Sequence, residues 1–249
     1  MTKKIWITGA SSGIGRALAI KFSNEGWQVA ASARRENLLN DLNKNNPNIH
    51  AFVLDVKDEK SVRNVFQNIL QKFETLDICV FATVIHDPEA EKKLSSEKIR
   101  EIMETNFFGT LNCIMAVNSF FREKKDGHIA IVSSVAGYRG LPAASGYCAS
   151  KAALTSLAES LYFDFKRKNV KVSLISPGFI KTPMTDRNTF PMPMIKSPEY
   201  AAEKIFVGLT KKNSFEIHFP KSFTILLKLL KIMPNWLFFW LVERGVKRF

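Results

Sequence analysis

The chain has 249 residues, of which 46% are hydrophobic and 24% charged, the balance of a globular protein long enough to bury a sizeable core. Its net charge of +13 attracts anions such as phosphorylated cofactors and acidic lipid surfaces. No segment interleaves basic with aromatic residues, so we expect no nucleic-acid partner. Cys79, Cys113 and Cys148 are few, odd in number and widely spaced, which argues against a disulfide framework or a metal site and indicates a reducing, cytoplasmic compartment.

Apolar segments of strand length alternate with amphipathic segments of helix length along most of the chain. Strands are predicted at residues 4–8, 28–33, 49–56, 77–84, 128–134, 170–176 and 214–219. Helices are predicted between them at 15–25, 36–45, 58–73, 95–121, 143–165 and 197–210. This order predicts an α/β fold with a doubly wound parallel sheet, Rossmann-like, in a single domain over residues 1–220. A short amphipathic C-terminal extension over residues 221–249 follows it.

A glycine-rich loop follows the first predicted strand and opens the first predicted helix. In the segment ITGASSGIG, Gly9, Gly13 and Gly15 have the spacing GxxxGxG. Glycine permits a tight turn and a close backbone approach to a ligand, and the free N–H groups at a helix start suit a pyrophosphate. The loop therefore predicts a nucleotide site, formed by Gly9, Ser11, Ser12, Gly13, Ile14 and Gly15. The competing interpretation is a loop that only reverses the chain.

The second predicted strand ends in ASARRE, at the place where an NAD-binding fold usually carries an acid for the ribose 2′-hydroxyl. Ala33 stands there instead, and Arg34 and Arg35 follow. Guanidinium groups hold a 2′-phosphate through paired, charge-assisted hydrogen bonds. The segment therefore favours NADP(H) over NAD(H). If these arginines belong only to a solvated helix start, NAD(H) remains the alternative cofactor.

Four motifs resemble those of the short-chain dehydrogenase/reductase family. They are TGASSGIG at 8–15, LDV at 54–56, IVSSVAG at 131–137 and YCASK at 147–151. The segments TNFFG at 105–109 and SPGFIKT at 176–182 add to the likeness. Together the motifs follow the family's order over residues 5 to 210, and their combination is far more specific than any one of them.

The resemblance implies a role for each matching residue. Tyr147 is the acid/base, and Lys151 assists it and holds the nicotinamide ribose. Ser134 hydrogen-bonds the substrate oxygen, and Asn106 supports a proton relay through water. Such a site needs no metal. For the cofactor, the resemblance adds Asp55 and Val56 near the adenine, Pro177, Gly178 and Thr182 near the nicotinamide carboxamide, and Tyr147 and Lys151 themselves.

The tyrosine and lysine of YCASK are four residues apart, so both project from one face of the predicted helix. Two unit charges at ~4 Å and an effective dielectric of about 20 interact by roughly 4 kcal/mol. We therefore expect Lys151 to lower the pKa of Tyr147 and to ease proton transfer. Ser134 ends a strand at the sheet edge where such folds hold ligands. Without these neighbours, the alternative interpretation of the pair is a surface tyrosine that packs on the lysine side chain. We interpret Cys148 as a packing residue and His86 as a loop histidine.

One segment departs from the family pattern. The resemblance calls for Asn-Asn-Ala-Gly after the fourth strand, and Phe81, Ala82, Thr83 and Val84 stand there instead. Two polar side chains and a glycine are missing, so the hydrogen bonds that tie this strand to its neighbour are in question. We expect altered cofactor affinity rather than lost chemistry, with Thr83 recovering some polarity.

Two apolar segments follow the SPGFIKT motif. The first, at 183–196, is rich in Met, Pro and Phe and reads as a substrate lid for a lipophilic substrate, or as an irregular loop packed on the body. The second is the tail, where Lys228, Lys231 and a Pro-Asn break leave no apolar run of the ~18 residues that span a bilayer. Two short amphipathic helices are predicted there, serving as an interfacial membrane anchor, a flap over the substrate pocket or a subunit contact.

The sequence predicts an NADP(H)-dependent oxidoreductase that interconverts a carbonyl and a secondary alcohol by hydride transfer. A lipophilic small-molecule carbonyl or alcohol is the expected substrate, and a homodimer or homotetramer is the expected assembly. The alternatives are the same chemistry with NAD(H), and a nucleotide-bound scaffold without turnover. The expected location is cytoplasmic, with membrane association through the tail as an option.

Overall fold

The structure, a computed structural model, describes residues 2–188 and 190–246. Met1, residue 189 of the predicted lid and residues 247–249 of the predicted extension lie outside the described residues.

Within that part of the chain, seven strands form one parallel sheet in the order β3-β2-β1-β4-β5-β6-β7. Their bounds are β1 (Lys4–Thr8), β2 (Gln28–Ala33), β3 (Ile49–Val53), β4 (Ile78–Phe81), β5 (His128–Val132), β6 (Lys171–Pro177) and β7 (Glu216–Phe219). The chain winds outward from β1 in one direction and from β4 in the other. The strand order therefore reverses between β1 and β4, and the carboxyl ends there are where such sheets bind ligands. The predicted fold is confirmed.

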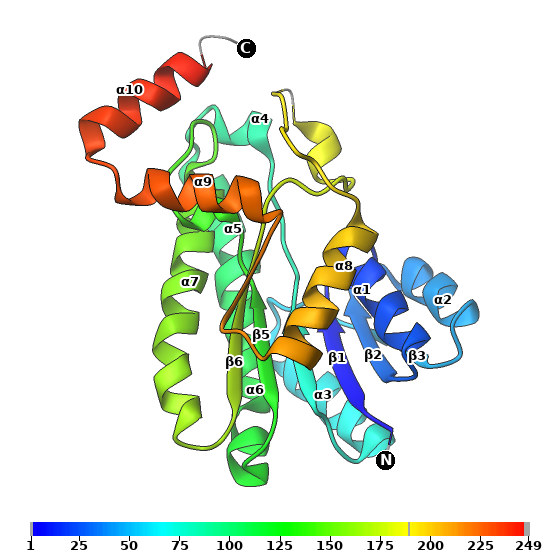
Figure 1. Cartoon of the computed structure of the whole chain (residues 1–249). Helices are drawn as coiled ribbons and strands as arrows, with labels where there is room; N and C mark the ends of the chain where they lie inside the picture. The colour runs from blue at the N-terminus through cyan, green and yellow to red at the C-terminus, as the bar shows by residue number, and fades with distance from the viewer. Residues whose placement is uncertain (1, 189, 247–249) are drawn as a thin grey trace.

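Helices cover both faces of the sheet (Figure 1). One face carries α1 (Gly13–Asn24), α2 (Glu36–Lys44) and α8 (Pro198–Val207), and the other carries α3 (Glu59–Phe73), α6 (Gly109–Lys124) and α7 (Ser145–Lys166). Alternate strand residues enter opposite layers because the side-chain period of a strand is two. On β1, Ile5 and Ile7 enter the first layer, whereas Trp6 enters the second. The buried Trp6 indole N–H donates to the Ser32 hydroxyl at 2.9 Å, so its polar atom is satisfied.

The segment predicted as one helix over 95–121 is interrupted. It forms α5 (Ser96–Met103), a π-helical turn over Glu104–Phe108, and then α6. Ser95 caps the start of α5 by accepting from the amide of Lys98 at 3.3 Å. A hydrophobic pattern does not distinguish a π turn from the α-helix on either side of it, because the extra residue changes the phase only locally. The turn carries Asn106, and such turns occur often at functional sites.

Most of the smaller elements lie around the carboxyl end of the sheet. The helix α4 (Pro88–Glu91) follows β4, and two 3-10 turns span Val135–Gly137 and Thr185–Arg187. A second π turn, Gly208–Lys212, extends α8. The tail forms α9 (Lys221–Ile232) and α10 (Asn235–Val246), as predicted, with the break at Met233 and Pro234. In Figure 1 these two helices lie at the same end of the molecule as α4, opposite the labelled N-terminus.

Candidate active site

The glycine-rich loop crosses the carboxyl ends of β1 and β4. Gly9 has φ +70°, and a Cβ built there would lie 2.8 Å from the carbonyl oxygen of Ala82. Gly13 has φ +55°, and its Cβ would lie 3.0 Å from the Thr182 methyl group. Gly9 therefore requires glycine for both conformation and space, whereas at Gly13 the positive φ favours glycine and the space beside Thr182 is tight. The second contact brings the glycine loop beside the SPGFIKT loop, two predicted cofactor segments that are 169 residues apart from Gly13 to Thr182 in sequence.

The start of α1 is built to receive an anion. Ser12 is its N-cap but makes no side-chain capping bond, and the first turn contains no acidic residue. Amides at the start of a helix that no side chain caps retain hydrogen-bonding capacity for a ligand. The positive end of the helix dipole adds to their attraction for phosphate.

Arg35 lies against this same loop. Its Nη2 donates to the Ser11 hydroxyl at 2.8 Å and to the Ser12 hydroxyl at 2.7 Å. A guanidinium is thereby held beside the glycine loop at the end of β2, where a dinucleotide's ribose lies in this fold. Arg34 is exposed next to it, and no hydrogen bond to its side chain is seen among the described residues. The residues present therefore fit a phosphorylated dinucleotide.

Asp55 and Val56 lie just beyond the end of β3. The half-buried carboxylate of Asp55 accepts from the Lys57 amide at 3.0 Å, which orients it in a short turn. The buried Val56 side chain is packed against Gly109, and its carbonyl accepts from the Asn112 side chain at 3.0 Å. On the far side of the loop, Pro177 ends β6, and Gly178 packs against Phe223 of α9. The predicted adenine and carboxamide segments thus flank the glycine loop.

Tyr147 and Ser134 meet at the carboxyl end of β5. Ser134 follows β5 and is buried, and its hydroxyl accepts from the Ala136 amide at 3.1 Å. Tyr147 lies in the first turn of α7, close enough to Ser134 for the serine hydroxyl to lower the pKa of the phenol. The structure therefore brings these two hydroxyl-bearing side chains close together at the carboxyl end of β5.

Lys151 lies one turn further along α7 and is almost fully buried. Its Nζ is 5.7 Å from the centre of the Tyr147 ring and donates to the carbonyl of Val132 at 2.9 Å. Burial lowers the pKa of Lys151 to about 7, because the charged ammonium loses hydration that one carbonyl only partly replaces. At neutral pH the Lys151 side chain is therefore close to its own pKa, and it lies near the Tyr147 ring.

The structure contradicts the expected effect of this lysine on the phenol. Burial raises the pKa of Tyr147 to about 12, the nearby Ser134 hydroxyl acts in the opposite direction, and the Glu91 carboxylate adds to the rise. Desolvation wins because the ammonium is not in contact with the phenolic oxygen and is itself close to neutral. The phenol is therefore protonated at neutral pH, which is the form a proton donor requires.

Asn106 links the segment after β4 to α7. Its side chain is fully buried, accepts from the Ile85 amide at 2.8 Å and donates to the Ile85 carbonyl at 3.0 Å. The same amide group also donates to the Ser150 hydroxyl at 3.1 Å, which in turn donates to the Tyr147 carbonyl at 2.8 Å. This chain of hydrogen bonds fixes the segment after β4 against α7.

The Phe81–Val84 departure is compensated by backbone contacts. The amide of Ala82 donates to the Thr8 hydroxyl at 3.2 Å, which ties the end of β4 to β1. Ala82 and Thr83 also lie directly against Gly9, whose missing side chain makes the approach close. The connection between neighbouring strands is therefore retained by other groups, and no hydrogen bond of the Thr83 hydroxyl is seen among the described residues.

Two residues in the site were not anticipated from the sequence. The imidazole of His86 lies against the Tyr147 ring, with centroids 4.4 Å apart and planes at 33°. Its Nδ1 is 2.8 Å from an oxygen of Glu91, a buried residue of α4. The interpretation of His86 as an ordinary loop histidine is therefore incomplete. A charged residue in a short polar segment gives no sequence signal of burial, because only the tertiary fold encloses it.

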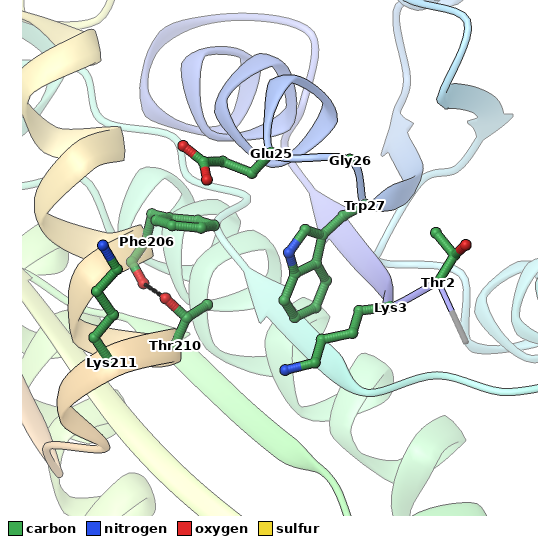
Figure 2. Close-up of a pocket in the computed structure, with 8 residues that line it drawn as sticks. All are labelled: Thr2, Lys3, Glu25, Gly26, Trp27, Phe206, Thr210 and Lys211. Atoms are coloured by element: carbon green, nitrogen blue, oxygen red, sulfur yellow. Dashed lines mark hydrogen bonds between the residues drawn. The ribbon is translucent and has the colours of Figure 1, made fainter.

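A hollow at the opposite end of the sheet is separate from this site. Its lining includes Lys3, Trp27 and Phe206, with the Lys3 ammonium 5.4 Å from the Trp27 ring (Figure 2). Lys3 precedes β1 and Trp27 precedes β2, so the hollow lies at the amino ends of the strands. Parallel sheets of this kind bind ligands at the carboxyl ends, so we assign the hollow no part in the chemistry.

Comparison with known proteins gives a consistent answer. The sequence profile described as short chain dehydrogenase matches residues 3–193. An uncharacterized oxidoreductase of Myxococcus xanthus is 33% identical over 236 residues, covering 93% of each chain. The 3-oxoacyl-[acyl-carrier-protein] reductase FabG of Thermotoga maritima is 28% identical, covering 84% of this chain and 91% of its own.

Among solved structures, that of ElxO with NADP bound is similar, with a TM-score of 0.77 and 25% identity, covering 88% of this chain and 98% of its own. The profile spans most of the chain, and the oxidoreductase relative is similar along nearly its whole length. The chain is therefore an oxidoreductase that belongs to the short-chain dehydrogenase family.

Proposed function

We propose that this chain is an NADP(H)-dependent reductase that interconverts a carbonyl and a secondary alcohol, acting on a lipophilic substrate. The observation that carries the proposal is the proximity of Tyr147 and Ser134, with the buried Lys151 ammonium nitrogen 5.7 Å from the centre of the Tyr147 ring. Bound reduced nicotinamide supplies the hydride to the carbonyl carbon. Ser134 orients the carbonyl oxygen by donating a hydrogen bond, and the Tyr147 phenol gives that oxygen its proton.

The half-buried position of the Tyr147 phenol supports its role as the proton donor. Tyr147 is protonated at neutral pH, and the tyrosinate left after proton transfer has Lys151 within one helical turn. An ammonium at that distance favours the anion in a site of low dielectric. Asn106 holds the adjoining segment in place, and we propose that it also supports proton resupply through water.

A lipophilic substrate is supported by the segment between β6 and α8. There Phe190 and Met194 are exposed apolar side chains, and Phe190 faces Phe179 with centroids 6.0 Å apart. Phe179 in turn faces Phe223 of α9, at 5.4 Å. These rings lie beside Gly178, and we propose that they receive the apolar part of the substrate. The name of the Thermotoga relative, a 3-oxoacyl reductase, suggests an acyl chain as the first probe.

A panel of β-keto esters with increasing acyl length tests the function, with NADPH and NADH followed by their absorbance. We expect faster turnover per enzyme at longer chain length and with NADPH. A preference for short polar ketones would refute the lipophilic substrate, and no turnover of any carbonyl would refute the reductase.

The cofactor preference can be tested at Arg35. Replacing Arg35 with alanine should raise the KM for NADPH about 10- to 100-fold, because hydrogen bonds to charged groups contribute about 1.5–3 kcal/mol. The KM for NADH should change less than about threefold, since that cofactor has no 2′-phosphate. Steady-state kinetics with both cofactors measures the difference.

Arg63→Ala is the matched control, because it removes one exposed arginine from α3, away from the loop. Equal losses for both cofactors in Arg35→Ala would instead mean that Arg35 only shapes the loop through Ser11 and Ser12.

We further propose that the tail helices, over the described part of the predicted extension, lie on an anionic membrane surface. Their exposed apolar side chains are Ile225, Leu226, Leu229, Ile232, Trp236, Phe239, Trp240 and Leu241. Their basic residues include Lys221, Lys231 and Arg244. No helix in the described ranges is long and apolar enough to cross a membrane. An apolar face with neighbouring cations suits binding at the bilayer interface.

Contacts on the opposite side hold these helices to the body. Arg139 donates to the carbonyls of Leu230 and Met233 at 2.9 and 2.8 Å and stacks on the buried Phe238 ring at 4.0 Å. Thr224 is fully buried and hydrogen-bonded with His218. Because Arg139 lies in the loop between Ser134 and Tyr147, membrane binding would bring the bilayer close to that loop.

Membrane contact is tested by substituting Ile232, Trp236 and Phe239 together with serine, since these side chains are 79%, 72% and 61% exposed. Vesicle flotation with phosphatidylglycerol should show at least an approximately 100-fold weaker partition, because burying one such side chain contributes about 1.5–3 kcal/mol. The matched control is Val53→Ser, which replaces an exposed apolar side chain at the end of β3. Unchanged flotation would refute the anchor, and a changed mass in solution would assign this face to a subunit contact.

The predicted homodimer or homotetramer remains a proposal. Its support is the exposure of Met115 on α6 and Phe163 on α7, two large apolar side chains on adjacent helices of one face. Light scattering of the full chain measures the mass directly. The predicted cytoplasmic location is likewise a proposal, supported by Cys79, Cys113 and Cys148, all free and buried.

A further inference from the structure

His86 and Glu91 form a buried pair beside the proposed proton donor. The side chain of Glu91 is fully buried, and that of His86 is 9% exposed. One Glu91 oxygen is 2.8 Å from His86 Nδ1. Because an ionised carboxylate can only accept, Nδ1 carries the hydrogen in this contact. This bond fixes both the tautomer and the plane of the imidazole, in the way that a carboxylate orients a histidine elsewhere.

The second oxygen of Glu91 holds the beginning of α7. It accepts from the amide of Gly146 at 2.7 Å and from the amide of Tyr147 at 3.2 Å. Ala144 is the N-cap of α7 and makes no side-chain capping bond. Glu91 therefore caps the catalytic helix from another element, and a negative charge at this end is also favoured by the helix dipole. One carboxylate thus connects the backbone of Tyr147 to the imidazole that lies on its ring.

The imidazole and the phenol are in contact along their faces. Their centroids are 4.4 Å apart and their planes differ by 33°, a tilted stack. Rings in such contact restrict each other's rotation. Without the imidazole, one face of the Tyr147 ring would lose its neighbour, and the phenolic oxygen could move relative to Ser134. Misplacement of a reacting group by about 1 Å can cost about 100-fold in rate.

We propose that His86 is a positioning residue for Tyr147, held by Glu91 and acting through ring contact rather than through proton transfer. The proposal rests on the assignment of Tyr147 as the proton donor. The charged groups facing His86 are Glu91 and Asp87 on its own side and Lys151 from α7. Burial is the largest influence and lowers the pKa of His86, so the ring is neutral when it packs on the phenol at neutral pH.

Two substitutions separate the ring contact from the hydrogen bond. His86→Phe keeps an aromatic ring against Tyr147 and loses the bond to Glu91. His86→Asn keeps an N–H donor toward Glu91 and loses the ring. Ring positioning predicts that His86→Asn lowers kcat about 10- to 100-fold, while His86→Phe stays within about threefold of wild type. The KM for NADPH should remain within about twofold in both.

The assay uses the full chain and a β-keto ester that the wild type reduces, with thermal melting and NADPH fluorescence as checks of folding. His50→Asn is the matched control: His50 also pairs with a polar side chain, Gln28, and lies against an aromatic ring, Phe73, but it is on β3. A kcat of His86→Asn within threefold of wild type would overturn the proposal. So would equal losses in both folded variants, because the imidazole would then act by its own chemistry.

A second measurement does not depend on turnover. The Hε1 resonance of His86, identified by its disappearance in His86→Phe, should move downfield in Tyr147→Ala, because the phenol that shields it is gone. It should move little in Tyr147→Phe, which keeps the ring. An unmoved resonance in Tyr147→Ala would show that the rings do not stack in solution. This result stands even if no carbonyl is reduced, so it separates failure of the ring contact from failure of the proposed reaction.

Discussion

Replacing Tyr147 with phenylalanine should lower kcat for carbonyl reduction by about 1,000-fold, within the range of about 10² to 10⁴ for general acid catalysis. The substitution removes one oxygen and keeps the ring that lies against His86. The Ser134 hydroxyl then has no phenol beside it, and a carbonyl oxygen developing negative charge receives no proton. NADPH binding should stay within about twofold, because the glycine loop and Arg35 are untouched.

Single-turnover reduction and NADPH titration of the same preparation measure the two effects separately. Tyr162→Phe is the matched control: Tyr162 lies on the same helix with its ring near Phe215 at 5.3 Å, away from Ser134. Retention of more than a tenth of wild-type kcat in Tyr147→Phe would contradict Tyr147 as the proton donor. A parallel loss of NADPH binding would place its main role in the cofactor site.

Replacing Lys151 with methionine should remove a pH dependence of stability. The folded-state pKa of Lys151 is about 7, against 10.5 when unperturbed. Between these values the unfolded chain binds the proton and the folded chain does not, so unfolding free energy rises with pH. The cost of burying this lysine is full below pH 7 and disappears as pH rises toward 10.5. From pH 7 to 10 the wild type should gain about 3 kcal/mol relative to Lys151→Met.

Urea unfolding at intervals between pH 6 and 10 gives the difference between the two proteins. Taking the difference cancels the buried cysteines, whose raised pKa values affect both proteins alike. Lys166→Met, at the exposed end of the same helix, should run parallel to wild type. Parallel curves for Lys151→Met and wild type would mean that the ammonium retains its hydration in the folded chain.

The expected effects of Tyr147→Phe and Lys151→Met depend on burial, which the spacing of residues along a helix does not predict. The spacing of Tyr147 and Lys151 predicts a shared helical face, and the structure has both on that face. The expected lowering of the phenol's pKa is wrong, because spacing gives proximity but not burial. Desolvation is set by everything that packs around α7, including β5 and the loop after it.

The glycine loop shows the opposite case. Its three glycines, the strand before it and the helix after it are local features, and they predicted the fold at this point correctly. Arg35 was predicted from its position after β2, and its contact with Ser11 and Ser12 joins two predicted segments. The close approach of Gly9 to Ala82 explains how the family's usual tetrad is replaced, and that required the packed structure.

The sequence by itself determined the parallel α/β architecture, the family motifs and the residues proposed for the chemistry, because alternation of apolar segments and glycine spacing are properties of neighbours along the chain. Only the tertiary structure revealed the π turn at Asn106, the burial that sets the pKa values of Tyr147 and Lys151, and the His86–Glu91 pair. Each of these depends on groups brought together from distant segments, and their desolvation exists only once the chain has folded around them.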